Sequence, residues 1–334
     1  MTNKYYNMYE RLNQELLNEL ARGKDIKVLH NVTYPPDRRA LDYVVEYESK
    51  KALIKFSKAI SSRSKIYQEL KRLSEELEVN SLIVADKFND RELLYDIVYI
   101  RNRIGIISRI TLRHYISNGK VFIYEYNGMF YVKIDGKRLK ALRERKGYRI
   151  HELASMTGIT AKTLREYEEG NIDMSIEKAY RFLEVLGKEF EGVVKEVDIF
   201  NDRIIHKGKE HKALMHEKVY RKISVDQRYK IIEKFKKYGL DVTIYSAIPS
   251  DAILSSAQSR FFISYLGRDL RSEEIEVKCR ENYLLAKTFE GKPVIIVEED
   301  VNRYALRVAE EYGITKKVTD VEELAKEIIK ENRR

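Results

Sequence analysis

The segment from residue 136 to 186 constrains this chain more than any other. Apolar residues recur in it at helical spacing, in short runs separated by turn signals and not by long loops. Gly147 ends one predicted helix, and Gly158 lies where a tight turn needs a left-handed backbone. Thr160 is a favourable N-cap for the next helix, which stops at Gly170. The segment therefore predicts a compact group of short helices.

The last helix of this group is predicted to begin after Ser175, which can cap it. Its inner face is expected to consist of Ile176, Ala179, Tyr180, Leu183 and Leu186. Ala154, just before the turn, is small enough to let the preceding helix approach closely. A helix, a tight turn and a second helix form the geometry that places one helix in the major groove of DNA. The segment thus predicts a DNA-binding helix-turn-helix.

These residues resemble the Cro/lambda-repressor type of helix-turn-helix, the xenobiotic-response-element family. The resemblance rests on Leu-Ala before the turn, Gly-Ile-Thr within it and Tyr-Glu-x-Gly after the second helix. It implies a recognition helix over 160–169. It also implies an ion pair between Arg143 and Glu168 inside the domain, so that Arg143 belongs to the scaffold. The residues it implies nearest the bases or the flanking phosphates are Thr160, Ala161, Lys162, Thr163, Arg165 and Glu166.

The charge pattern departs from that family in two respects. Arg149 and Ile150 stand where the family usually has Ser or Thr followed by a phosphate-binding Gln. The recognition helix also carries three glutamates beside its two cations, which is unfavourable next to a polyanion. Positive charge lies instead on the first helix and its exit. We expect phosphate contacts from Lys137, Arg138 and Arg149, with a solvated basic face as the alternative.

Composition limits the remaining classes of protein. A chain of 334 residues with 43% hydrophobic residues suggests two or three folded domains. Its net charge of +10 suits a nucleic-acid partner. One cysteine, Cys279, excludes an internal disulfide framework and a multi-cysteine zinc site. Because no membrane span or signal peptide is recognisable, a cytoplasmic protein without a membrane partner is expected.

Two α/β regions are predicted on either side of the helical segment. The expected domains are 1–133, a central all-α lambda-repressor-like domain at 134–192, and 195–334 for dimerisation or sensing. In the first region, alternation predicts strands over 41–49 and 50–57, then a helix capped by Ser64 and a hairpin at Asn127-Gly128.

The two α/β regions share short strings that suggest a duplication. KKALIKFSKAISS at 50–62 is echoed by HKALMHEKVYRKIS at 211–224, and GIISRIT at 105–111 by GITKKVT at 313–319. Ser224 and Gln227 offer a capping box in the second copy. About fifty residues around 247–297 are then expected to be an enlargement of that copy. Chance similarity between two ordinary β-α-β segments is the alternative.

The element order of the first region is similar to the restriction-endonuclease-like fold. Nucleases of that fold hold Mg²⁺ with an Asp on one strand and an acid two residues before a Lys on the next. The candidates are Asp42 and Lys55, but Leu53 occupies the position of the second acid. Glu46 could substitute for it. An inactive nuclease-like scaffold is therefore expected, with no catalytic residue.

Other sites for cofactors or metals are poorly supported. No Gly-rich phosphate loop has the Walker spacing. The spacing of His206, His211 and His216 suits neither one face of a strand nor one turn of a helix. Cys279 has no recognisable nucleophile context. No enzyme activity, cofactor or metal is therefore expected.

The whole layout resembles a family of archaeal helix-turn-helix transcriptional regulators. That resemblance implies a sequence-specific regulator that binds double-stranded DNA. A homodimer is expected because one small helix-turn-helix buries little surface, whereas two half-sites double the contact. Two alternatives remain: a metal-dependent nuclease that its helix-turn-helix targets to DNA, and a protein-interaction module whose helix-turn-helix is vestigial. The sequence identifies no effector ligand.

Overall fold

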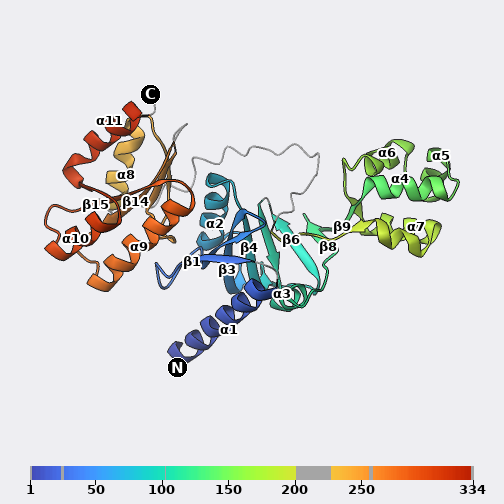
Figure 1. Ribbon diagram of the computed structural model, residues 1–334, viewed down its shortest axis with the longest axis horizontal. Coiled ribbons are helices and arrows are strands. Elements are labelled where there is room, and N and C mark those ends of the chain that lie inside the picture. The colour runs from blue at the N-terminus through green and yellow to red at the C-terminus, as the bar shows by residue number, and fades with distance from the viewer. Residues whose placement is uncertain (1, 24–25, 102, 201–226, 256–258, 332–334) are drawn as a thin grey trace. The chain divides into compact units, whose positions relative to one another are not determined.

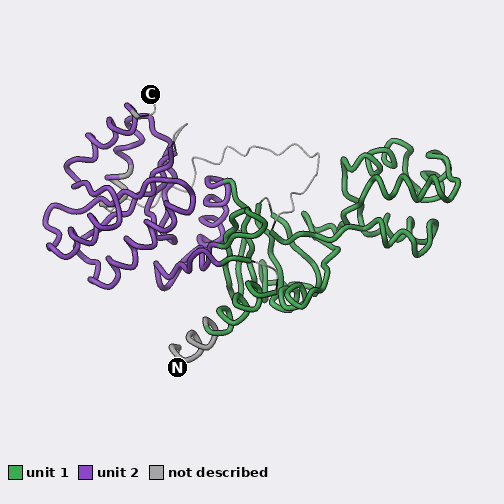
Figure 2. Tube along the Cα trace, in the orientation of Figure 1, with its two compact units in different colours: residues 1–27, 45–62, 78–211 green, residues 28–44, 63–77, 212–334 purple. Residues whose placement is uncertain are grey.

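The chain divides into two compact units in the computed structural model, which describes residues 2–23, 26–101, 103–200, 227–255 and 259–331 (Figure 1). Unit 1 comprises Met1–Lys27, Val45–Ser62 and Glu78–His211, and unit 2 comprises Val28–Val44, Arg63–Leu77 and Lys212–Arg334 (Figure 2). This division differs from the three predicted domains, because two N-terminal segments group with the C-terminal part of the chain. Among the described residues, no helix is long and apolar enough to cross a membrane.

The larger sheet has the strand order β1-β2-β3-β4-β7-β6-β8-β9-β10, with β5 beside β4 and β11 beside β9. β3 pairs in parallel with β4, and β4 in parallel with β7. The strands are β1 (Lys27–Asn31), β2 (Tyr43–Tyr47), β3 (Lys50–Ile60), β4 (Asn80–Phe88), β5 (Arg91–Glu92), β6 (Ile97–Arg101), β7 (Ile104–Ile107), β8 (Ile123–Tyr126), β9 (Met129–Ile134), β10 (Met174–Ser175) and β11 (Val194–Lys195). The helices of the same part of the chain are α1 (Thr2–Gly23), α2 (Lys65–Glu76) and α3 (Arg109–Ile116).

Local turn chemistry in this part follows the sequence. The turn between β2 and β3 places Glu48 and Ser49 at positive φ, and the β8–β9 hairpin does the same with Asn127 and Gly128. Ser64 caps α2 by accepting a hydrogen bond from the backbone of the third helical residue. The predicted strands, helix cap and hairpin are therefore confirmed.

The helical domain begins and ends beside the same strand of the larger sheet, β9. It contains α4 (Gly136–Arg145), α5 (Ile150–Met156), α6 (Ala161–Glu168), α7 (Ile176–Leu186) and the 3₁₀ helix η1 (Lys188–Val193). β9 leads into it, and both β10 and β11 pair antiparallel with β9. The prediction of an all-α domain at 134–192 is therefore not confirmed, because the two-residue strand β10 lies inside this segment and pairs with β9. Both ends of the helical domain are thus attached to β9.

The C-terminal part of unit 2 has a five-stranded sheet with helices on both faces. Its order is β12-β13-β14-β15-β16, antiparallel up to β14 and parallel from there. Alternate residues of β14 and β15 pack with α8 and α11 on one face, and with α9 and α10 on the other. The elements are α8 (Gln227–Lys237), β12 (Asp241–Ile244), β13 (Ala252–Ser255), β14 (Arg260–Leu266), α9 (Ser272–Thr288), β15 (Lys292–Val297), α10 (Arg303–Tyr312), β16 (Ile314–Lys317), η3 (Val318–Asp320) and α11 (Val321–Glu331).

This arrangement corrects one expectation about the C-terminal region. Residues 247–297 were expected to enlarge a fold, but they include β13, β14, α9 and β15 and so form the centre of its sheet. The string at 211–224 and the capping residue Ser224 lie outside the described residues. Six of the seven residues of β14 are buried, as are six of the eleven residues of β3, although the two strands share few residues in sequence.

Gly136 is required where α4 meets the end of α6. A Cβ at this position would lie 2.4 Å from the carbonyl oxygen of Glu168 and 2.5 Å from that of Tyr167. Because both are backbone atoms, we expect Gly136→Ala to destabilise the domain by about 1–3 kcal/mol. Urea unfolding measures this loss, and Gly192→Ala is the matched control because its Cβ would meet nothing within 4 Å. Equal stability of the two variants would contradict the prediction.

Candidate nucleic-acid interface

The two helices around the turn are held by a small buried core. Leu153 and Ala154 of α5 and Leu164 and Tyr167 of α6 are each at most 2% exposed. Gly158 has φ of +66° in the turn between them. Burial raises the pKa of the Tyr167 hydroxyl to about 12, which keeps this core residue neutral. The predicted helix-turn-helix geometry is therefore present in the folded chain.

Thr160 acts as the predicted N-cap of α6. Its hydroxyl accepts a hydrogen bond of 3.1 Å from the backbone N–H of Thr163 and lies 2.9 Å from the hydroxyl of that residue. The cap satisfies a backbone donor that the first helical turn leaves without a partner. Thr160 thus has a structural role at the start of the helix, in addition to any contact with DNA.

The outer face of α6 carries its two cations. Lys162 and Arg165 are exposed, whereas Ala161, Thr163 and Glu166 are partly buried. Of the three glutamates, Glu168 is turned inward, with a side chain only 6% exposed. The exposed face is therefore less acidic than the sequence of the helix suggests.

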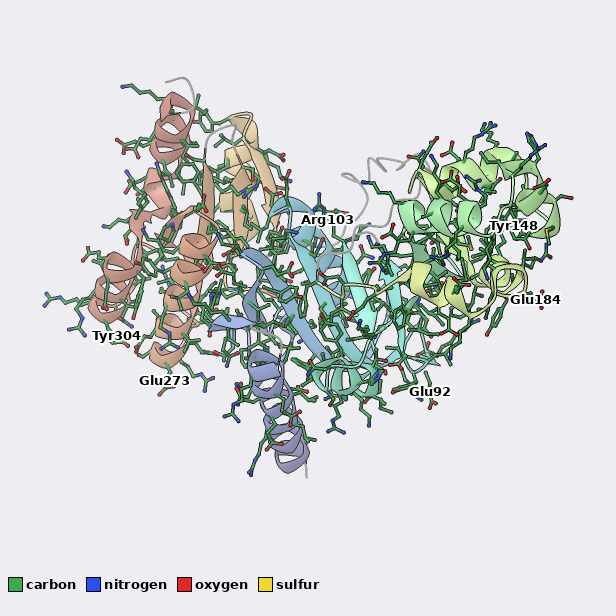
Figure 3. The ribbon with its side chains drawn as sticks, turned by 45° about the vertical axis from the view of Figure 1, so that its right-hand side comes forward. Glu92, Arg103, Tyr148, Glu184, Glu273 and Tyr304 are labelled. Atoms are coloured by element: carbon green, nitrogen blue, oxygen red, sulfur yellow. The ribbon has the colours of Figure 1, made fainter. Side chains whose placement is uncertain are left out.

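Arg143 of α4 holds Glu168 of α6 in a bidentate ion pair. The Nε–Oε1 distance is 2.5 Å and the Nη2–Oε2 distance is 3.1 Å. Arg143 also donates 3.0 Å to the carbonyl of Tyr148, which Figure 3 labels together with Glu184 of the same domain. The hydrogen bond to Glu168 raises the pKa of the guanidinium above its ordinary value. This pair is the one that the Cro-type resemblance implies, and it places Arg143 in the scaffold.

The basic residues expected on phosphates remain on the surface. Lys137, Arg138 and Arg149 are exposed. Arg138 lies 3.5 Å from the carboxylate of Asp135 and donates to the carbonyl of Gly192. Lys137 and Arg149 are thus the less constrained of the three. Arg145, at the end of α4, and Lys146, directly after it, both contact Glu189, which offsets their charge.

α7 contributes one basic residue that sequence analysis missed. A Cβ at Gly158 would lie 2.6 Å from Nη1 of Arg181, so this exposed guanidinium lies against the turn that precedes α6. The inner face of α7 was predicted correctly at Ala179 and Leu186, which are buried, and wrongly at one position. Tyr180, predicted to face inward, is 62% exposed, and Phe182 is fully buried instead.

The nuclease candidates do not fit a magnesium site. Asp42 is buried, and its Oδ1 accepts a hydrogen bond of 2.7 Å from Nε of Arg39. Leu53, at the position of the second acid, is fully buried and has no oxygen to offer. The described residues contain no group of three or more acidic, histidine or cysteine side chains that could hold a metal ion. His206, His211 and His216 lie outside those residues.

Two further features are explained by the fold itself. Burial raises the pKa of the Cys279 thiol to about 12, which leaves it unreactive.

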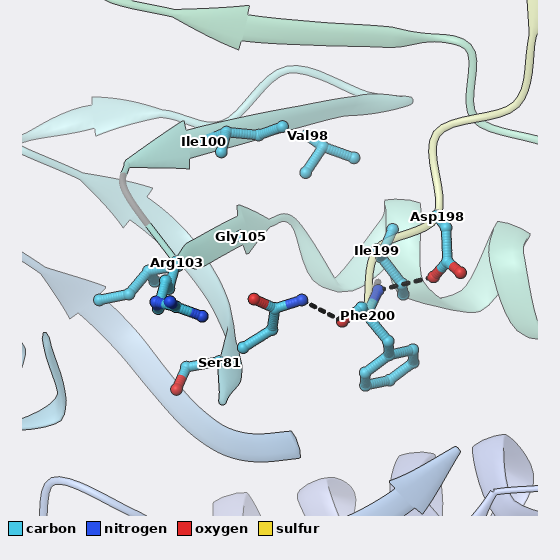
Figure 4. Close-up of a pocket in the computed structure, with 10 residues that line it drawn as sticks. Ser81, Val98, Ile100, Arg103, Gly105, Asp198, Ile199 and Phe200 are labelled. Atoms are coloured by element: carbon cyan, nitrogen blue, oxygen red, sulfur yellow. Dashed lines mark hydrogen bonds between the residues drawn. The ribbon is translucent and has the colours of Figure 1, made fainter. Parts of the chain in front are cut away.

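A hollow beside Gly105 lies where β4, β6 and β7 meet residues 198–200 (Figure 4). The side chain of Asn80 donates 2.8 Å to the carbonyl of Phe200 there. This hydrogen bond holds residues 198–200, which follow the helical domain, against the larger sheet.

Two family models match separate parts of the chain. A helix-turn-helix model matches residues 139–193, and a PD-(D/E)XK superfamily domain model matches residues 9–121. The N-terminal α/β region thus carries a nuclease-like domain, as its element order predicted. The match alone leaves open whether this domain is an enzyme. No solved structure is significantly similar to the chain.

Curated archaeal proteins with the provisional name HTH-type transcriptional regulatory protein are similar to this chain. One from Pyrococcus horikoshii is 33% identical over 61% of this chain and 62% of its own length, so the match spans less than two thirds of that relative. One from Methanocaldococcus jannaschii is 25% identical over 94% of this chain and 97% of its own. One from Archaeoglobus fulgidus is 24% identical over 78% and 79%. The resemblance to archaeal helix-turn-helix regulators is therefore confirmed.

The Arg143–Glu168 pair generates a prediction about stability. Arg143→Ala leaves a buried carboxylate without its cation, and we expect a loss of about 3–5 kcal/mol in the free energy of unfolding. The double variant Arg143→Met/Glu168→Leu should recover most of this loss, because it removes both charges. Arg145→Ala, which breaks an exposed pair, should cost at most about 1 kcal/mol. Urea unfolding of the variants checks all three values, and a small effect of Arg143→Ala alone would refute the scaffold role.

Proposed function

We propose that this relative of archaeal helix-turn-helix regulators is a sequence-specific, DNA-binding transcriptional regulator that reads the major groove with residues 160–169. The observation that carries the proposal is the outer face of α6. Lys162 and Arg165 are exposed there, on a helix whose other side is packed into a buried core. A helix held by its buried core can present two exposed cations to guanine edges or phosphates.

The other proposed DNA contacts come from the remaining residues of α6 and from basic residues of α4 and the start of α5. Ala161, Thr163 and Glu166 are the proposed neighbours of the bases, with Glu166 able to accept from cytosine. Thr160 contributes through its place at the helix start. Lys137, Arg138 and Arg149 are proposed to bind phosphates, which would set the register without reading sequence.

We further propose that the functional species on double-stranded DNA is a homodimer. One helix-turn-helix contacts a single half-site, and two contacts a helical turn apart supply the area that specific binding requires. In this proposal residues 134–192 bind DNA, and residues 1–133 and 195–334 form the two flanking α/β regions.

The two flanking regions are proposed to be duplicates. The order α1–β1–β2–β3–α2–β4 has a counterpart in α8–β12–β13–β14–α9–β15, with the same neighbours in the two sheets. β3 and β4 are parallel, as are β14 and β15. The string GIISRIT covers residues 105–107 of β7, and GITKKVT covers all of β16. β7 and β16 are the next parallel neighbours of β4 and β15. This equivalence of place supports a common origin more strongly than shared letters do.

Individual residues support the same equivalence. Asp42 precedes β2 and Asp251 precedes β13, and the carbonyl of each accepts a hydrogen bond from the backbone just after the preceding strand, at 2.8 and 2.9 Å. Between the helix and the next strand, Glu78 and Glu290 have the same φ of 57°. Because a left-handed conformation is uncommon for residues other than glycine, the shared position of these two glutamates supports the equivalence.

A metal-dependent nuclease remains the second candidate, because the PD-(D/E)XK model matches residues 9–121. We propose that the nuclease-like folds are inactive. Asp42 is paired with Arg39, and its counterpart Asp251 accepts 2.6 Å from Nζ of Lys278, which is 1% exposed. In both places a cation of the chain itself contacts the carboxylate.

We therefore expect no Mg²⁺-dependent cleavage of DNA by the purified protein. Incubation of supercoiled and linear DNA with Mg²⁺ or Mn²⁺ tests this, with the Asp42→Ala variant alongside. Cleavage by the unaltered chain that disappears in Asp42→Ala would establish the nuclease and remove the proposal of inactivity.

The regulator proposal predicts a specific loss of DNA binding. We expect Lys162→Ala/Arg165→Ala to weaken binding to a discrete genomic fragment by about 10- to 1,000-fold, and to lower the salt slope by about two. Mobility-shift titrations at two salt concentrations with competitor DNA measure both effects.

The matched control removes the same charge elsewhere. Lys58→Ala/Lys87→Ala replaces two exposed lysines of β3 and β4, outside the helix-turn-helix. This control should keep its affinity within a few-fold. Weak, salt-sensitive binding that both double variants change equally would instead mean non-specific charge attraction, and the regulator proposal would then be withdrawn.

A further inference from the structure

Glu69 of α2 makes an unusual set of contacts within unit 2. Its side chain is buried, with 1% of the residue exposed. Oε2 accepts hydrogen bonds from the backbone N–H groups of Ser246, at 2.9 Å, and Ala247, at 2.6 Å. Oε1 accepts from the hydroxyl of Ser246 at 2.7 Å. One carboxylate of α2 thus binds the loop that follows β12.

Glu281 of α9, in the C-terminal region, makes the corresponding contacts with a loop of the N-terminal region. It is 2% exposed, and its two oxygens accept from the backbone N–H of Thr33 at 2.9 and 3.0 Å. Oε1 also accepts from the hydroxyl of Thr33 at 2.6 Å, and Oε2 from the N–H of Tyr34 at 2.9 Å. This carboxylate binds the loop that follows β1.

The two glutamates occupy equivalent places in the two proposed copies. Each lies about two turns before the end of its helix, at Glu76 in α2 and at Thr288 in α9. Each accepts two adjacent backbone N–H groups and one hydroxyl. A further hydrogen bond joins the two regions directly, from the N–H of Ala40 to the carbonyl of Ala247 at 2.6 Å. The contact is therefore reciprocal.

We infer that this reciprocal contact is an internal dimer interface, through which the C-terminal fold serves as the built-in partner of residues 28–44 and 63–77. The inference rests on the proposed duplication. The surface of the C-terminal fold around Ser246, Ala247 and Glu281 is then already occupied within the chain. Two copies of the chain therefore have to associate through a different surface.

The chemistry explains why the contact is selective. A buried carboxylate is costly unless donors surround it, and adjacent backbone N–H groups with a hydroxyl provide such donors. Each glutamate takes these three donors from the loop of the other copy, and Glu69 also lies 3.9 Å from Nη2 of Arg72 on its own helix. Separation would therefore leave two carboxylates and four backbone donors to be solvated again, and the two contacts should form and open together.

Hydrogen exchange of the full chain tests this coupling. Glu69→Ala should speed exchange at Ser246 and Ala247, which it bonds directly, and also by about tenfold or more at Thr33 and Tyr34, which it does not touch. Glu281→Ala should produce the converse pattern. Faster exchange confined to the directly bonded loop would overturn the inference, because the contacts would then be independent.

Matched variants on the same helices serve as controls. Glu75→Ala and Glu273→Ala each remove an exposed acid from α2 or α9 and should leave both loops protected. If either alanine variant fails to fold, Glu69→Gln and Glu281→Gln retain one acceptor oxygen and should show the same coupled loss in weaker form. Protection of both loops in both glutamine variants would count against the inference.

Dilution distinguishes an internal partner from a second copy. Protection of the two loops should be independent of protein concentration across a range in which light scattering reports the mass. Protection that disappears on dilution to the monomer would show exchange between two chains and overturn the internal assignment. DNA binding by the same variants reports on the regulator proposal alone, because none of the altered residues lies in the helix-turn-helix.

Discussion

The strand β9 is the element on which the DNA-binding part depends. It pairs with β8 in the larger sheet, and with β10 and β11, which lie within and directly after the helical domain. Two of its residues, Val132 and Ile134, belong to the same buried cluster as the cores of α5 and α6. The helix-turn-helix is therefore built onto a sheet strand at both its beginning and its end, and not attached by a single linker.

Several buried carboxylates of the described residues lie beside hydrogen-bond donors of the chain itself. Glu168 is paired with Arg143, and Asp251 is paired with Lys278. Glu69 and Glu281 accept hydrogen bonds from backbone N–H groups and hydroxyls. Each of these four carboxylates has donors at hydrogen-bond distance, as its removal from water requires. Lys162 and Arg165 are exposed instead, which suits them for a partner from outside the chain.

Much of the helix-turn-helix could be predicted because its signals are local. Gly158 and the Thr160 cap act within a few residues, and a left-handed glycine or a cap has the same meaning in any fold. The inner face of α7 was less certain, since Tyr180 and Phe182 both fit an amphipathic helix and only the packing of neighbouring helices buries Phe182. The close approach at Gly136 likewise depends on the end of α6, far along the chain.

The sequence by itself determined the helix-turn-helix, its turn and caps, and the nuclease-like order of the N-terminal elements, because short-range backbone and capping preferences decide them. Only the tertiary structure decided which strands of the C-terminal fold are neighbours. β14 lies parallel to β15, as β3 lies parallel to β4, although β14 and β3 share few residues in sequence. The tertiary structure also decided which groups Glu69 and Glu281 bind. A carboxylate finds its donors by distance in space, and these donors are more than a hundred residues away in the chain.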